Sequence, residues 1–372
     1  HVIKTTDLAE LTGDINSSEM LPTRIGLIAY TLFTSGSTGV PKGVEVFRSA
    51  LNHYIDWSSN HLDLFNGSVC SQHPNVGFDL SVIDIFTTLC NGACLAVFDT
   101  NVDKLTPHKK IKELSISHWV SVPSVIDLMA QYDRINPIDL SSLKYAFFCG
   151  EPLFETQLNF LFKKCPNLTV FNAYGPTEAT VSCTSIELKK HNYMRHTHKG
   201  MVSIGEAING MELIIDGDAE GELIIKGIQV ANGYLNDSIK TGEKFILGPD
   251  QRFNKFKTGD WIKIINGQKY FIERIDRQIK HAGFRIELGE IEAALRKVTK
   301  DKLCVAIYTQ GAIFAFVESS NSISNDLVNK LRSFLPRYML PKHIFPVDHM
   351  PRNKNDKVDY NQLEEKVKNG TY

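Results

Sequence analysis

The sequence predicts an α/β protein with a large N-terminal domain and a small C-terminal α+β domain. Short apolar runs alternate with helical patterns through the first half, strand-rich segments begin near Gly205, and a helix between strands follows Asp276. A chain of 372 residues is long enough for two or three such units. The expected boundaries are 1–275 for the large domain, with α/β structure to about 200 and β-rich structure over about 201–275, and 277–372 for the small domain.

The first half has the rhythm of βα units. Apolar runs such as "LKYAFFCGE" and "LTVFNAYG" alternate with amphipathic stretches such as "VIDLMAQY" and "LNFLFKKC". Alternation of this kind is typical of a largely parallel sheet with helices on its faces.

The middle of the chain has the composition of β-strands. "GELIIKGIQVANGYL" and "WIKIINGQKYFIERID" are rich in strand formers, and Asn266-Gly267 is a strong signal for a hairpin turn. These segments predict a compact β subdomain.

The last part begins with "GFRIELGEIEAALRKV", in which Leu288, Ile291 and Leu295 fall on one helical face. "LCVAIYT" and "AIFAFVES" indicate strands, and "DLVNKLRSFL" indicates another helix. Together they predict a small α+β domain after a charged linker.

Composition excludes several classes of protein. A net charge of −1 gives no overall attraction to nucleic acid or to an anionic membrane, and no apolar run approaches the roughly 20 residues of a membrane span. Seven irregularly spaced cysteines favour reduced thiols over a disulfide framework or a zinc site, which predicts a cytoplasmic protein.

The stretch "YTLFTSGSTGVPKGVEV" places glycines, hydroxyls and one lysine between apolar runs. Such a loop is either an ordinary surface loop or a cradle for phosphate, in which backbone N–H groups and hydroxyls approach an anion and Lys42 supplies charge. It is not a Walker A loop, because Pro41 precedes the lysine and Gly43 follows it.

A second candidate, "NAYGPTEATV", follows an apolar run and should lie at the carboxyl end of a strand, where ligands of open α/β sheets gather. Tyr174 could stack on a base and Glu178 could hold Mg²⁺ near phosphates. The alternative is a turn with Thr177 as helix N-cap.

Three further segments are weaker when taken singly. Asp260 in "FKTGDW" could bind two ribose hydroxyls or belong to a hairpin entry, and Arg274 could meet phosphate or ribose or be a solvated charge. Lys357, in a polar loop of the tail, would by itself be read as surface charge.

These motifs, in this order, resemble those of the adenylate-forming superfamily, from about Arg24 to the C-terminus. The matching stretches are "TSGSTGVPKG", "AYGPTE", "GELIIKGIQVANGYLN", "FKTGD", "RIDRQIKHAGFRIELGEIE" and "NDKVDY". "RIELGEIE" and "LPRYMLP" are similar to the branch that activates amino acids for a carrier protein. The resemblance implies a large α/β domain with a β-barrel-like subdomain, short at its N-terminus compared with the family, and a small mobile C-terminal domain.

The resemblance also implies that ATP and Mg²⁺ are the cofactors. Glu178 would bind the metal, Lys357 would be the catalytic cation on the carboxylate and α-phosphate, and Asp276 would be the hinge. The implied ATP- and AMP-binding residues are Thr34, Ser35, Gly36, Ser37, Thr38, Gly39, Lys42, Asn172, Ala173, Tyr174, Gly175, Thr177, Asp260 and Arg274.

For the second substrate the resemblance implies that Asp79 pairs with an α-ammonium group, although Asp79 could instead cap the helix that follows it. The implied pocket is narrow, so the side chain accepted should be small, and D-alanine is the leading candidate. Cys149 is expected in the pocket wall and not as a nucleophile. The remaining wall residues are Ser121, Phe147, Gly150, Ala173 and Val181.

The implied reaction forms an aminoacyl-adenylate and passes the acyl group to the phosphopantetheine thiol of a separate carrier protein, with the enzyme acting as a monomer. Two alternatives remain open at this stage. One is an acyl- or aryl-CoA ligase, against which the carboxylate of Asp79 counts. The other is a truncated, non-catalytic module, for which the short N-terminal segment and Asp356 beside Lys357 count.

Overall fold

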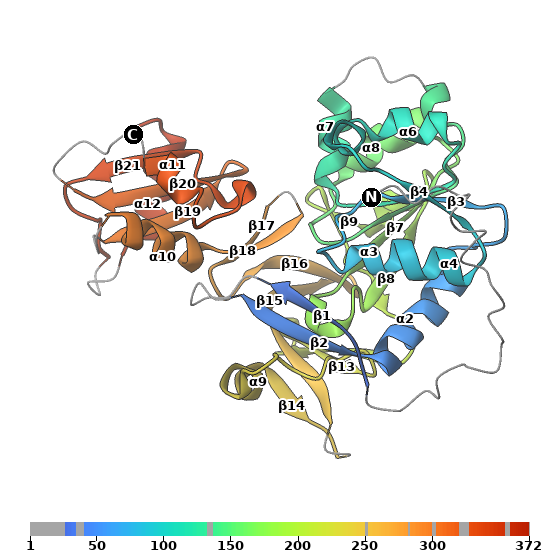
Figure 1. Ribbon diagram of the computed structural model, residues 1–372, viewed down its shortest axis with the longest axis horizontal. Helices are drawn as coiled ribbons and strands as arrows, with labels where there is room; N and C mark the ends of the chain where they lie inside the picture. Colours follow the sequence, from blue (N-terminus) through green and yellow to red (C-terminus); the bar gives the residue numbers. More distant parts are fainter. Residues whose placement is uncertain are drawn as a thin grey trace, which may run out of the picture.

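The computed structural model describes residues 27–34, 41–131, 137–249, 252–281, 283–299, 303–319, 327–353 and 358–371. Figure 1 shows a large α/β body with a β-rich part beneath it and a smaller α/β part to one side, which carries the C-terminus. The hairpin β17–β18 lies between the two parts (Figure 1). The predicted fold class is confirmed.

A seven-stranded sheet forms the centre of the large domain, in the order β11-β8-β7-β6-β5-β3-β4. Strands β4, β3, β5, β6 and β7 run parallel, as predicted, and β8 and β11 add an antiparallel edge. The strands are β3 (Val69–Gln72), β4 (Cys94–Val97), β5 (His118–Ser121), β6 (Tyr145–Phe148), β7 (Thr169–Tyr174), β8 (Thr184–Leu188) and β11 (Glu206–Ala207).

Helices cover both faces of this sheet, which explains why its central strands are apolar throughout. Ala146 and Phe148 point into a core shared with α6, α7 and α8, whereas Phe147 points into a core shared with α2 and α3. Alternate side chains of β6 point to opposite faces of the sheet, so this strand contributes to two hydrophobic layers. The helices are α2 (Arg48–His61), α3 (Leu80–Val82), a π-helix (Ile83–Thr87), α4 (Thr88–Cys90), α5 (Asn101–Leu105), α6 (Pro107–Glu113), α7 (Ser124–Gln131) and α8 (Glu155–Lys164).

The β-rich part is an antiparallel sheet in the order β12-β13-β15-β14, with β16 also paired to β15. Asn266 and Gly267 both have positive φ at the β15–β16 turn, which confirms the predicted hairpin. The described strands form an open sheet and not the barrel-like closure that was expected. The elements are β12 (Met211–Asp216), β13 (Glu220–Gly227), α9 (Ser238–Lys244), β14 (Phe245–Leu247), β15 (Phe253–Ile265) and β16 (Gln268–Arg274).

Short elements complete the large domain. The hairpin β1 (Ile28–Thr34) and β2 (Lys42–Phe47) pairs Thr34 with Lys42 and thereby frames the glycine-rich loop. Four 3₁₀ segments and one two-stranded ribbon connect the larger elements. They are Pro137–Leu140, Thr177–Ala179, Tyr193–His196 and Arg337–Met339 (the last in the small domain), and β9 (Thr197–His198) with β10 (Met201–Val202).

The C-terminal part has hydrophobic clusters of its own, one on each face of the sheet β19-β20-β21. Leu288, Ile291 and Leu295 are buried on one face of α10, as their spacing predicted. In the described ranges no helix is long and apolar enough to cross a membrane. The elements are β17 (Gln278–His281), β18 (Phe284–Glu287), α10 (Leu288–Thr299), β19 (Cys304–Thr309), β20 (Ala312–Glu318), α11 (Leu327–Leu331), β21 (His343–Val347) and α12 (Tyr360–Lys368).

Candidate functional site

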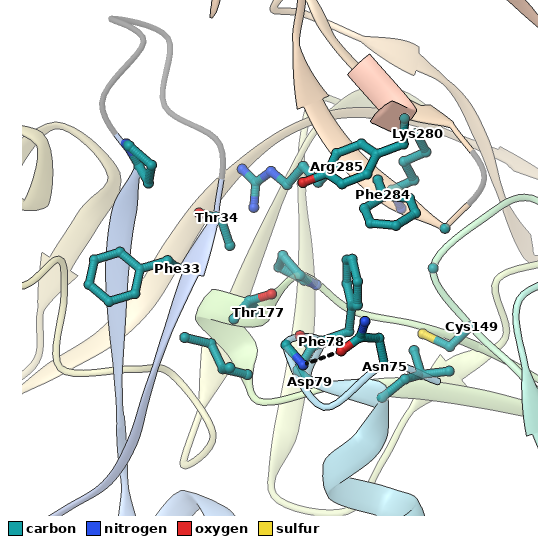
Figure 2. Close-up of a pocket in the computed structure, with 18 of the residues that line it drawn as sticks. Phe33, Thr34, Asn75, Phe78, Asp79, Cys149, Thr177, Lys280, Phe284 and Arg285 are labelled. Atoms are coloured by element: carbon teal, nitrogen blue, oxygen red, sulfur yellow. Dashed lines mark hydrogen bonds between the residues drawn. The ribbon is translucent and has the colours of Figure 1, made fainter. Parts of the chain in front are cut away.

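A cavity of about 570 Å³, called the central cavity below, lies where the carboxyl ends of the parallel strands meet the hairpins β1–β2 and β17–β18. Figure 2 shows Lys280 and Arg285 reaching into it from β17 and β18, opposite Asp79 and Cys149. The cavity brings together site residues predicted from separate segments of the sequence. Those lining it are Thr34, Asp79, Cys149, Gly150, Gly175, Thr177, Val181, Asp260 and Arg274.

The turn after β7 carries the second predicted motif. Glu178 lies in a 3₁₀ turn, and Thr180 and Val181 have positive φ, a conformation that costs energy for β-branched residues. A Cβ at Gly175 would lie 2.5 Å from the Cα of Ser182, so only glycine allows the two backbone segments to approach. Packing around this turn therefore holds Glu178 at the strand end.

Glu178 is fully buried and both of its carboxylate oxygens accept hydrogen bonds. The Tyr234 hydroxyl donates to Oε1 at 2.8 Å, and Nη1 of Arg285 donates to Oε2 at 2.8 Å. Burial opposes ionisation, but the charges of Arg285 and Lys42 outweigh it, so the pKa of Glu178 is lowered. The group is an ionised carboxylate whose neutralising cation is an arginine.

Lys42 opens β2, and its side chain is 9% exposed. Its Nζ lies 3.7 Å from Oε1 of Glu287 and 5.2 Å from the ring centroid of Tyr234. Burial and the neighbouring Arg285 lower its pKa, against the opposing effect of Glu178 and Glu287. The Thr34 hydroxyl, beside it in the hairpin, is buried and has no partner among the described residues.

The five residues from Ser35 to Gly39, which make up most of the predicted phosphate loop, lie outside the described residues. Lys357, the predicted catalytic cation, also lies outside them. Their predicted roles stay predictions.

Asp260 and Arg274 form a buried pair at one end of the central cavity. Nη1 of Arg274 donates to Oδ1 of Asp260 at 2.6 Å, and the Tyr174 hydroxyl donates to Oδ2. Arg274 also makes a two-bond contact with Asp276, through Nε at 2.6 Å and Nη2 at 2.7 Å. The predicted hinge residue is thus held by the arginine that also holds the predicted ribose ligand.

Tyr174 faces a second, smaller pocket that adjoins the central cavity at Gly150 and Lys280. Asn172 and Ala173 line this pocket, and the Asn172 amide donates to the Ser203 carbonyl at 2.8 Å. The ammonium of Lys280 lies 5.2 Å from the ring centroid of Tyr174. A basic side chain therefore covers the ring that was predicted to stack on a base.

Asp79 precedes α3 but makes no capping hydrogen bond, so the helix-cap alternative does not describe its role. Burial raises its pKa to about 6, although Thr177 acts in the opposite direction. Cys149 is buried, with Sγ 3.9 Å from the Val181 carbonyl, and burial raises its pKa to about 12. An unionised buried thiol is a poor nucleophile, in agreement with its predicted role as wall.

Three predicted wall residues, Ser121, Phe147 and Ala173, do not line the central cavity, and Ala173 lines the smaller pocket instead. Phe147 packs behind Cys149 in the core of the sheet, and the hydroxyl of Ser121 lies 2.9 Å from Nδ1 of His73. Ser121 was placed in the wall by resemblance alone. Its buried hydroxyl pairs with the His73 ring and does not line the cavity.

Residues to which no individual role was predicted contribute as strongly as those with one. Tyr234, Arg285 and Glu287 contact Glu178 or Lys42, and Lys280 covers Tyr174. The alternation Arg-Ile-Glu in β18 is the signal that could have found two of them, since residues two apart share a strand face. The partner of Arg285 lies 107 positions away and that of Tyr234 lies 56 positions away, which local patterns do not reveal.

Glu178 can be assessed as a magnesium ligand from its own chemistry. The described residues contain no group of three or more His, Cys, Asp or Glu that could hold a metal. Mg²⁺ at nucleotides commonly takes one or two carboxylates, with phosphate oxygens and water completing the octahedron. The carboxylate of Glu178 fits that chemistry, provided that Arg285 moves off it.

Comparisons with known proteins agree with this geometry. A family model described as "AMP-binding enzyme" matches residues 6–235. The D-alanine–D-alanyl carrier protein ligase of Staphylococcus epidermidis is 33% identical over 353 residues, which is 91% of this chain and 71% of the relative. The ligase of the same name from Staphylococcus aureus (strain bovine RF122 / ET3-1) is 34% identical over 352 residues, with the same coverage.

Among solved structures, the Vibrio cholerae adenylation domain AlmE, in complex with glycyl-adenosine-5'-phosphate, superposes with a TM-score of 0.81 at 30% sequence identity. The match covers 92% of this chain and 66% of the AlmE chain. The chain thus spans about two thirds to seven tenths of the length of these proteins.

Proposed function

The chain belongs to the family of AMP-binding enzymes, and on that basis we propose that it activates a small amino acid, with D-alanine first among candidates, and transfers it to the phosphopantetheine thiol of a carrier protein. The observation that carries the proposal is the convergence of Asp79, Asp260 and Arg274 around the central cavity, with Glu178 buried behind the lining residue Arg285 and Lys42 near Glu287 on the same hairpin. They supply groups suited to an amino group, a metal, a ribose and phosphates within one site.

In the first step the ionised carboxylate of the amino acid attacks the α-phosphate of ATP, and pyrophosphate leaves. The nucleophile needs no base, so the protein's task is to orient the reactants and to stabilise charge on the phosphates. Lys42 and the loop before it would hold the β- and γ-phosphates, and Lys357 would contact the α-phosphate. Mg²⁺, bound by Glu178 and phosphate oxygens, would neutralise part of the triphosphate charge.

The nucleoside would lie at the other end of the site. Asp260 would accept hydrogen bonds from the ribose hydroxyls, and Arg274 would hold Asp260 in place or contact the nucleotide. The adenine would lie beside Tyr174, Asn172 and Ala173, where Lys280 now covers the Tyr174 ring and leaves a pocket of only about 20 Å³, so Lys280 would have to move away.

Asp79 favours an amino acid over a simple acyl substrate. Its side chain is half-buried and lines the cavity, so an α-ammonium group bound there would provide an ionic partner for the carboxylate. Cys149 and Val181 close the cavity beside it, which favours a small side chain. A substrate without an amino group would leave the carboxylate unpaired.

In the second step the carrier thiol attacks the acyl-adenylate and AMP leaves. We place the division between residues 1–275 and 277–372, with Asp276 as the hinge. The described arrangement, in which β17–β18 lines the cavity, suits this transfer step. The seven cysteines are all free, which agrees with work in the cytoplasm, and the enzyme would act as a monomer on a separate carrier.

The test is ATP–pyrophosphate exchange with a panel of D-alanine, L-alanine, glycine, D-serine, D-valine and propionate. D-alanine should give the fastest exchange, at least about tenfold above D-valine and propionate, because one or two misplaced groups cost 1–3 kcal/mol. Exchange with propionate alone would favour an acyl ligase. If the folded protein gave no exchange with any of these compounds, the result would favour a non-catalytic module.

The pKa of Asp79 predicts how activity depends on pH. Burial raises this pKa to about 6, so below pH 6 the carboxyl is mostly neutral and forms no ion pair with the amino acid. The kcat/KM for the amino acid should therefore fall about tenfold per pH unit below 6, mainly through KM. Initial rates from pH 4.5 to 8 at saturating ATP measure this.

Asp79→Asn provides the control for that profile. The variant should have a low kcat/KM at every pH and no inflection near pH 6, while its thermal unfolding stays cooperative. An unchanged inflection in the variant would assign it to another group.

A further inference from the structure

The central cavity is lined by both parts of the chain. Asp79 and Cys149 line it from the large domain, and Glu290, Pro336 and Met339 line it from the small one. With the amino acid bound at Asp79, as proposed above, a carrier thiol has to enter this cavity to reach the acyl group. Side chains of the small domain that face the cavity are therefore placed to act on the thiol.

Glu290 is a carboxylate in such a position. It lies half-buried in the first turn of α10, and its Oε2 is buried without a hydrogen-bond partner among the described residues. Buried polar atoms are normally paired, and an unpaired one is costly. Oε2 is thus an acceptor to which the described part of the chain supplies no hydrogen.

Two other carboxylates line the cavity among the described residues, and each has a role of its own. Asp260 accepts hydrogen bonds from Arg274 and Tyr174, and Asp79 is proposed to bind the α-ammonium group. The remaining carboxylate is Glu290. The cations that face the same space are Arg274, Lys280 and Arg285, of which Arg274 is bound to Asp260 and Asp276, and Arg285 to Glu178.

The immediate surroundings of Glu290 favour its protonated form. Burial raises the pKa of Glu290, and the charge of Glu287 raises it further. Burial and the charge of Glu290 also raise the pKa of Tyr338, which keeps that hydroxyl protonated. The Tyr338 ring stacks on Phe284 at a centroid distance of 3.5 Å, and Phe284 meets Phe78 edge to face at 4.7 Å (Figure 2). The carboxylate therefore lies beside an aromatic wall.

We propose that Glu290 is the general base of the transfer step and removes the proton from the thiol that attacks the acyl-adenylate. The inference rests on the proposed function. As the sulfur forms its bond to the acyl carbon, the S–H proton passes to the Glu290 carboxylate. The bond between the acyl carbon and the phosphate oxygen breaks, AMP leaves with that electron pair, and the protonated carboxyl returns its proton to water.

The two half-reactions differ in their need for a base. A thiol has a pKa of about 8.5, so only a small fraction is ionised at pH 7. A general base works best when its pKa lies near the working pH, so the raised pKa makes Glu290 better suited than an exposed glutamate. In the first step the nucleophile is an ionised carboxylate. Glu290 should therefore matter for transfer and not for adenylation.

The experiment compares both half-reactions from pH 7 to 9, using ATP–pyrophosphate exchange with D-alanine and single-turnover transfer from supplied D-alanyl-adenylate to pantetheine. At pH 7, Glu290→Gln should slow transfer about a hundredfold and leave exchange within about threefold of the wild type. At pH 9 the deficit in transfer should shrink to about fivefold, because most of a thiol with a pKa of about 8.5 is then ionised without a base. A glutamate that only stabilised α10 would give a deficit that does not change with pH.

Glu365→Gln is the matched control, since it makes the same chemical change at an exposed position of α12 in the same domain. It should leave both half-reactions unchanged. The wild-type transfer rate should vary by less than about threefold from pH 7 to 9, because the base removes the dependence on thiol ionisation.

A wild-type rate that rose in proportion to the ionised thiol would overturn the role of Glu290, and this arm needs no variant to fold. Transfer by Glu290→Gln at the wild-type rate at pH 7, or a deficit independent of pH, would overturn it as well. A wild-type protein with neither exchange nor transfer would instead reject the proposed function, and the general base with it.

Discussion

Replacing Lys357 by alanine should reduce amino-acid-dependent ATP–pyrophosphate exchange by at least about a hundredfold, because its ammonium would stabilise charge that develops on the α-phosphate. Transfer to a carrier thiol from supplied aminoacyl-adenylate should stay within about threefold of the unmodified enzyme, since no triphosphate takes part in that step. In the described arrangement β17 and β18 line the cavity, which leaves the transfer step to other side chains. Both half-reactions are measured on the same preparation.

Lys354→Ala is the matched control for this variant, because it removes a positive charge three residues earlier in the same polar segment. It should leave exchange and transfer unchanged. If Lys357→Ala lowered both half-reactions equally, one fixed arrangement would perform both steps and the proposed hinge at Asp276 would have no function.

The parts of the site that the sequence predicted lie at the ends of strongly apolar strands. β7 is buried along its whole length, and Tyr174 and the turn with Glu178 follow at its carboxyl end, as expected for ligand sites of open sheets. The hairpin at Asn266-Gly267 was predictable for a similar reason, because two residues with positive φ are favoured there. Strand ends and tight turns of this kind are determined by the residues at and next to them in the sequence.

The parts that the sequence did not predict depend on contacts between distant segments. "RIDRQIKHAGFRIE" was open to interpretation as a solvated charge run, yet Arg285 ends 2.8 Å from a carboxylate 107 positions earlier. Tyr234 orients the same carboxylate from the end of "GELIIKGIQVANGYLN", a motif whose letters do not reveal that contact. For Ser121 the resemblance implied a place in the pocket wall, but in the structure its hydroxyl pairs with His73. Charge and polarity are visible in a sequence, but their partners are set by packing.

Replacing Asp260 by asparagine should lower both half-reactions about a hundredfold, in contrast to Lys357→Ala. The carboxylate would accept hydrogen bonds from two ribose hydroxyls, each worth about 1.5–3 kcal/mol when an ionised group takes part. The nucleoside stays bound through adenylate formation and thiol attack, so the loss should appear in the KM for ATP and again in the rate of transfer at subsaturating adenylate.

The variant also tests whether Asp260 contributes mainly to stability. Arg274 keeps its two-bond contact with Asp276 when Asp260 is neutral, so the free energy of unfolding should fall by only about 1–3 kcal/mol. Glu212→Gln, which breaks the exposed pair with Lys226, is the control and should change neither activity nor stability. A folded Asp260→Asn protein with full affinity for ATP would show that this carboxylate serves only to hold Arg274, and the ribose would then need another ligand.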